Sequence, residues 1–133
     1  MAVNQIKKQD YAQDGKSILV ADSLAFSLGA VIGNTSVTAG ADGRKIIKAG
    51  TPVAGNILKR NTAFTKGSDA DAVAILLHDV DVTEGNANGT ILVSGYVDYD
   101  KLDTDVQALV TNALVARLPK ITFISGTKDV TLS

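Results

Sequence analysis

The side chains best suited to chemistry gather in one short stretch. His78, the only histidine of the chain, is followed closely by Asp79, Asp81 and Glu84. Imidazole and carboxylate groups bind divalent cations, and they also act as general bases in catalysis. The stretch therefore presents three possibilities: a metal site, a catalytic site, or a turn between two strands.

The spacing of these acids fits a calcium-binding loop only in part. Asp79, Asp81 and Thr83 occupy its first, third and fifth positions. The sixth position, where the sharp turn needs glycine, is Glu84, and the twelfth, where a bidentate glutamate is needed, is Thr90. We therefore expect no metal ion and no cofactor at this loop.

Catalysis would need partners that the sequence does not supply. The chain has no cysteine and no second histidine, so a zinc site would have only carboxylates beside His78. No G-x-S-x-G motif is present to place a nucleophile, and the acids between Asp98 and Asp105 suit loop and helix-cap positions in water. We expect a protein that is not an enzyme, in which His78 is packed or hydrogen-bonded at the end of a buried strand.

Composition limits the partners of the chain. Of its 133 residues, 45% are hydrophobic but only 5% aromatic, and 13 basic residues nearly balance 14 acidic ones, for a net charge of −1. The chain can bury a sizeable core, but it has neither the basic surface nor the stacking aromatics that nucleic acids require. No secretion signal is evident, and no apolar run approaches the roughly 20 residues that span a bilayer. We expect a protein made in the cytoplasm, with no nucleic acid and no membrane as partner.

The elements that position the acidic stretch are two expected strands. Val73–Leu77 is apolar on both faces, as in a strand buried on each side, and Thr90–Val97 follows after a polar turn. We expect the two strands to form a hairpin at the centre of the fold. Strict alternation along the second strand predicts two faces: Ile91, Val93 and Val97 on one, and Leu92, Ser94 and Tyr96 on the other.

Further short strands are expected on either side of this hairpin. Asp42-Gly43 is a favoured turn dipeptide and predicts a hairpin between Ser36–Thr38 and Arg44–Ile47. The remaining apolar runs predict strands at Val53–Leu58 and Ile121–Ile124, whereas the type of element at Ile18–Ile32 stays open.

One amphipathic helix is expected between Leu102 and Leu118, where apolar residues recur at helical spacing. Thr104 and Gln107 fit a capping box, Arg117 suits the last turn, and Pro119 would end the helix. The sequence thus predicts a β-rich α+β fold, a small domain of short strands and hairpins, compact and sandwich- or barrel-like, with one helix near the C-terminus.

The chain divides into a polar N-terminal segment, residues 1–17, and a single domain, residues 18–133. Val3, Ile6 and Tyr11 are isolated apolar side chains in the polar segment. The segment is therefore either a frayed terminus or an arm that orders on a partner surface, with these three side chains as anchors.

The order of motifs resembles that of the head decoration and head fibre proteins of tailed bacteriophages. The resemblance covers roughly residues 45–124. Four stretches carry it: "AGTPV" at Ala49–Val53, "AVAILLHDVD" at Ala72–Asp81, "TILVSGYV" at Thr90–Val97, and Lys101-Leu102 before the expected helix.

The resemblance implies a structural protein of the virion, made in the host cytoplasm, that binds the outer surface of a phage capsid and stabilises the head. Its partners would be the major capsid protein and other copies of itself, as a homotrimer, and an arm bearing Val3, Ile6 and Tyr11 would bind the capsid. An alternative from another class is a small cation- or carbohydrate-binding β module that uses the turn from Asp79 to Glu84.

Overall fold

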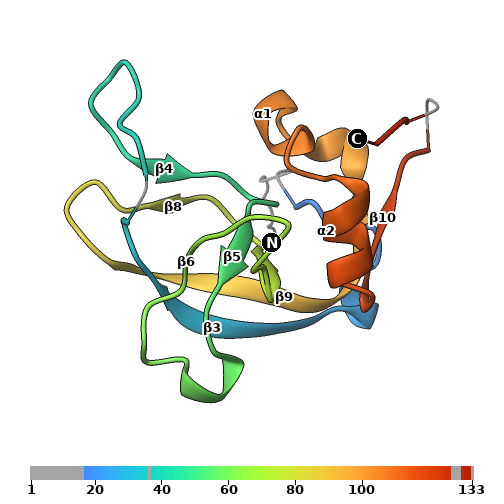
Figure 1. The fold of residues 1–133 in the computed structure, drawn as a ribbon, viewed down its shortest axis with the longest axis horizontal. Helices are drawn as coiled ribbons and strands as arrows, with labels where there is room; N and C mark the ends of the chain where they lie inside the picture. The colour runs from blue at the N-terminus through green and yellow to red at the C-terminus, as the bar shows by residue number, and fades with distance from the viewer. Residues whose placement is uncertain (1–16, 36, 127–129, 133) are drawn as a thin grey trace, which may run out of the picture.

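In the computed structural model, which describes residues 17–35, 37–126 and 130–132, the chain folds around one long strand, β9 (Ala87–Asp98) (Figure 1). Along one edge of β9 runs β3 (Phe26–Ile32), antiparallel to it. The other edge carries β7 (Ala74–Leu76), which is antiparallel, and β10 (Ile121–Ile124), which is parallel. The expected central pairing is confirmed, because β7 and β9 pair directly, but the two strands are not a simple hairpin, since a further short strand lies between them in the chain.

The sheet continues from β7 through β5 (Pro52–Ala54) to β6 (Thr65–Lys66), with antiparallel pairing throughout. A bridge between Ile32 and Phe64 then connects the end of β3 to the chain just before β6. Its hydrogen bonds run from Gly33 N to Phe64 O, 2.7 Å, and from Phe64 N to Val31 O, 2.8 Å.

A second, two-stranded sheet joins β4 (Ile46–Ile47) to β8 (Val80–Asp81). In Figure 1 this ribbon lies at one end of the molecule, and the helices and β10 lie at the other. The described residues thus form a strand-rich domain with two short helices, which confirms a β-rich α+β class.

Two apolar cores lie on opposite sides of β7, and this explains why its sequence is apolar on both faces. Ile75 packs in a first cluster with the helical region, whereas Ala74 and Leu76 pack in a second cluster with Phe64. All three residues of β7 are buried, as expected of a central strand. β7 and β9 therefore form the wall between the two cores.

The expected single helix is wrong, because the segment forms two short helices, α1 (Thr104–Gln107) and α2 (Asn112–Arg117). Thr111 lies between them in an extended conformation, and its hydroxyl accepts a hydrogen bond from Leu114 N at 3.1 Å. The expected capping box is also absent, since Gln107 donates to Tyr99 O at 3.0 Å. The apolar residues at four-residue spacing are nevertheless all buried in the first core: Val106, Val110, Leu114 and Leu118.

The expected faces of β9 are wrong beyond Leu92, because the strand contains a bulge. Phe26 pairs with Ser94 and the next residue, Ser27, pairs with Leu92, so β9 has one extra residue at this point. An extra residue reverses the alternation of side chains. Leu92 and Val97 consequently share the first core although an odd number of positions separates them.

Gly95 supports this irregularity. Its φ is 153°, and a Cβ atom there would lie 3.3 Å from Ala25 Cα.

Other expected strands are shorter than the sequence suggested. The Asp42-Gly43 turn forms, with φ of 80° at Gly43, but Val37 and Thr38 lie outside any strand, and β4 pairs with β8 instead. Val53–Leu58 divides into β5 and a 3-10 turn at Ile57–Lys59. β10 has the bounds that the sequence predicted.

The segment Ile18–Ile32, whose type the sequence left open, pairs with β9 in two separate places. Leu19 bridges to Val97, a 3-10 turn follows at Asp22–Leu24, and β3 then completes the pairing.

Candidate functional site

The structure separates the side chains of the acidic stretch. His78 is exposed, so the expectation that it is packed is wrong, whereas the alternative, that it is hydrogen-bonded, stays a prediction. Asp79 turns toward a neighbouring loop, where its Oδ1 accepts a hydrogen bond from Ala49 N at 2.8 Å. A shallow depression of about 240 Å³ has His78 and Asp79 in its wall together with Lys48 and Lys101. Asp79 therefore connects two loops.

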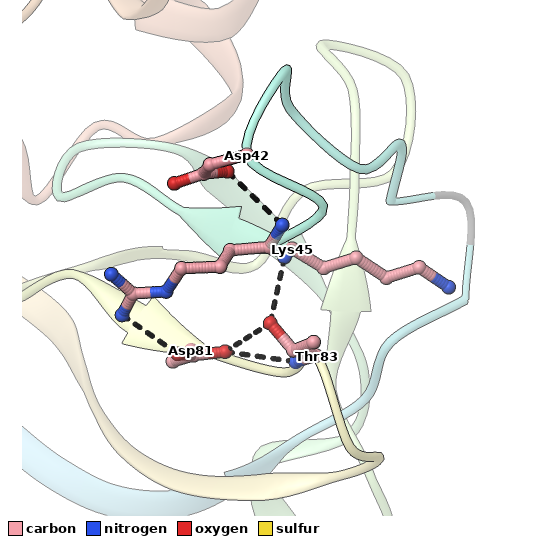
Figure 2. A network of polar contacts seen from close by, with 5 residues as sticks. Asp42, Lys45, Asp81 and Thr83 are labelled. Atoms are coloured by element: carbon pink, nitrogen blue, oxygen red, sulfur yellow. Dashed lines mark hydrogen bonds and ion pairs between the residues drawn. The ribbon is translucent and has the colours of Figure 1, made fainter.

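Asp81 belongs to a different network, on the β4–β8 ribbon (Figure 2). It accepts hydrogen bonds from the hydroxyl and the backbone N–H of Thr83 and from Arg44 Nη2 at 2.9 Å. These bonds, led by those from Thr83, lower the pKa of Asp81 from 3.8 to about 2. The Thr83 hydroxyl also accepts from Lys45 N at 2.8 Å. The network fixes the ribbon and the turn after it.

The acids do not come together as cation ligands. Across the described ranges, no three His, Asp or Glu side chains are grouped closely enough to hold a metal ion. Asp103 and Asp105 lie at the N-terminus of α1, as expected, and form ion pairs with Lys48 at 3.2 Å each. All three side chains are well exposed, so these pairs contribute little to stability.

A more distinctive feature is a group of exposed hydrophobic side chains around the C-terminal half of β9. The apolar face, as we call it, consists of five residues: Val20, Leu24, Phe26, Tyr96 and Ile124. Their side chains are between 37% and 61% exposed. Scattered apolar side chains are common on protein surfaces, but a contiguous group of them marks an interaction site.

The pairing of the strands places these residues on one side of the sheet. Leu19 and Val97 are bridged and both contact the first core, so their neighbours Val20 and Tyr96 point to the opposite side. Val20 N donates to Tyr96 O at 3.0 Å, which holds the two residues side by side.

The members of the apolar face on β10 and β3 also point away from the first core. On β10, Ile121 and Phe123 pack against the first core, so Thr122 and Ile124 point outward. Phe26, on β3, pairs with Ser94 of β9. Ser94 and Tyr96 both line a hollow in this surface. The hollow also includes Leu24 and has a volume of about 310 Å³.

Sequence reasoning did not find the apolar face. Its residues come from three separate stretches of the chain, around residues 20–26, at Tyr96 and at Ile124, and only the fold around β9 brings them together. A partial signal existed in β9, where Tyr96 was assigned to the face opposite Val97.

The predicted capsid-binding residues Val3, Ile6 and Tyr11 lie outside the described residues. The described chain begins at Ser17, and Ile18 O accepts a hydrogen bond from Asp98 N at 2.7 Å. The first described residues are therefore held against β9, next to the apolar face.

In the part of the chain that the structure describes, no helix is both long and apolar enough to span a bilayer; the longest, α2, has 6 residues. No family model matches the chain, and no curated protein matches it.

Proposed function

We propose that the chain is a structural protein, not an enzyme, that binds the outer surface of a tailed-phage capsid and stabilises the head. The observation that carries this proposal is the apolar face, because exposed apolar surface of this kind serves contacts with other proteins, including those between neighbouring copies on a shell. Burying the exposed parts of five such side chains would contribute on the order of 5 kcal/mol. Many such contacts repeated over a symmetric shell would together give strong overall binding.

The motifs behind the phage resemblance support the proposal by their position. "AVAILLHDVD" and "TILVSGYV" include the paired strands β7 and β9, around which the whole sheet is built. A shared central scaffold agrees with a family resemblance, whereas the acidic turn between the strands supplies internal hydrogen bonds.

We assign the capsid contact to the N-terminal segment, with Val3, Ile6 and Tyr11 as its apolar anchors and the major capsid protein as partner. The attachment of Ile18 and Val20 to β9 supports this assignment, since it fixes the point from which the segment leaves the domain. Assembly of the domain, residues 18–133, as a homotrimer and its location on the virion are parts of the same proposal. We further propose a barrel-like closure of the sheet, supported by the Ile32–Phe64 bridge.

Co-sedimentation with expanded capsids that lack their decoration protein tests the proposal. The full chain is expected to saturate the capsids, and a chain without residues 1–16 is expected to bind at least about tenfold more weakly, because apolar anchors of this size contribute that much. Ile6→Asp should weaken binding, whereas Gln5→Glu adds the same charge to the same segment and should not.

Two results would contradict parts of this proposal. If neither chain binds any expanded capsid, the decoration function is wrong. If the shortened chain binds as tightly as the full one, the function stands but the capsid contact lies on the folded domain.

A further inference from the structure

The apolar face combines projecting side chains with a hollow. Phe26 and Leu24 are 57% and 61% exposed, and the hollow of about 310 Å³ beside them is lined by Ser94, Tyr96 and Thr122. A surface with a projection and a hollow side by side can be complementary to itself when a two-fold axis exchanges them. The shape of the face thus suits a contact between identical surfaces.

The face extends to the edge of the sheet at β10. Among the described strands, β10 pairs only with β9 and ends the strand order. Ile124 is 37% exposed at this edge, next to the exposed Thr122. The exposed side chains of β10 continue the apolar face to the edge of the sheet, and in two faces stacked about a two-fold axis the β10 strands of the copies can lie antiparallel to each other.

Charges at the two ends of β10 favour this arrangement. Lys120 precedes the strand and lies in the wall of the hollow, and Asp98 pairs with Ile124 at the other end. In an antiparallel arrangement, Lys120 of one copy would lie near Asp98 of the other, so opposite charges would meet twice. The net charge of −1 adds little repulsion between copies.

We propose that the apolar face is a two-fold contact between copies of this chain, in which the two faces stack with their β10 strands antiparallel and with Phe26 of each copy in the hollow of the other. The inference rests on the proposed function only in that both use the apolar face as a surface for protein contacts. It adds a second contact, between copies, to the one that the N-terminal segment makes with the capsid.

Light scattering of the full chain after size exclusion, at rising protein concentration, tests the contact. Phe26→Asp places a charge at the centre of the face and is expected to halve the mass, from dimer to monomer or from paired trimers to trimer. Leu58→Asp is the matched control, because Leu58 is 91% exposed and is not part of the face. Circular dichroism establishes that both variants keep the fold.

Cysteine labelling provides a second measurement that does not depend on a disruptive variant. The chain has no cysteine, so Thr122→Cys and Leu58→Cys each introduce a single thiol. Raising the protein concentration is expected to slow maleimide labelling at position 122 and to leave labelling at position 58 unchanged.

A wild-type chain that stays monomeric, a mass that Phe26→Asp leaves unchanged, or labelling at position 122 that is independent of concentration would each overturn the inference. Capsid co-sedimentation distinguishes this failure from failure of the proposed function. A Phe26→Asp chain that binds capsids but loses half its mass supports both proposals, and one that binds capsids with unchanged mass overturns the two-fold contact alone.

Discussion

Asp81 shows how one exposed carboxylate contributes to stability in a pH-dependent way. Its pKa lies at about 2 in the folded chain, below the ordinary 3.8, mainly because Thr83 and then Arg44 donate hydrogen bonds to it. A lowered pKa means that the ionised form stabilises the fold above the ordinary pKa, and that this contribution is lost as the pH falls toward the folded value. We expect Asp81→Asn to melt below the wild type at neutral pH, with a gap that closes between pH 3.8 and about 2.

Thermal melts of both proteins across this range measure the gap. Glu84→Gln is the control, because it removes a negative charge from the same exposed turn outside the network of Figure 2. A gap that stays constant down to the lowest pH would mean that the ionised Asp81 carboxylate is not its source.

The sequence did not reveal the contacts that the side chains of this acidic stretch make. The faulty calcium register could be read locally, from Glu84 and Thr90. The partner of Asp81, Arg44, lies 37 positions away in the chain, and Asp79 binds Ala49, 30 positions away. Such pairs depend on how β4 and β8 are brought together, which no local pattern encodes.

At the scale of elements, the cap of α2 yields a direct prediction. Thr111 accepts from Leu114 N at 3.1 Å and donates to Asp69 Oδ2 at 2.9 Å. Removal of such a cap costs about 1 kcal/mol. We expect Thr111→Ala to lower the free energy of unfolding by that amount, measured by urea denaturation. Thr104→Ala is the control: Thr104 is exposed within α1, and we expect a change below about 0.5 kcal/mol. If Thr104→Ala instead lowered the free energy of unfolding more than Thr111→Ala, Thr104 would be the helix cap.

Helical periodicity predicted which side chains of this region are buried, but not that the helix is interrupted. Three poor helix formers follow one another here, Val110, Thr111 and Asn112. The Thr111 hydroxyl accepts a hydrogen bond from the backbone N–H of Leu114, which favours the start of α2 over the continuation of α1. In β9, the composition of the strand does not show the bulge opposite Phe26, since the extra residue is defined by its partner strand. Strand β10 was predicted with its observed bounds, because it lies between Pro119 and a polar tail and needs no special geometry.

At the scale of the whole molecule, the β-rich α+β class followed from short apolar runs and Gly-rich turns. The arrangement of the strands could not be predicted in this way. β10 pairs with β9 in parallel, and β3 pairs with β9 although more than 50 residues separate the two strands in the chain. The apolar face depends on that arrangement, because its members lie in three distant stretches of the chain, Val20 to Phe26, Tyr96 and Ile124. In the sequence they look the same as core residues. Exposure, rather than residue type, identifies them.

Phe64 tests how far the stability of the molecule depends on connecting the two ends of its sheet. Its backbone forms the bridge to Ile32, and its ring is fully buried in the second core, so closely packed under Gly55 that a Cβ atom there would lie 2.5 Å from Phe64 Cδ2. Truncation of a buried phenylalanine typically costs about 3–5 kcal/mol, a large fraction of the roughly 5–15 kcal/mol that stabilises a small domain.

We expect Phe64→Ala to lose about 3 to 5 kcal/mol in urea denaturation and to increase amide exchange in β3 and β6 together, because the ring supports both ends of the bridge. Leu58→Ala, at a 91% exposed position between β5 and β6, should change the free energy of unfolding by less than about 0.5 kcal/mol. If exchange rises in β6 while β3 stays as protected as in the wild type, the bridge does not couple the two strands, and β3 is held by β9 alone.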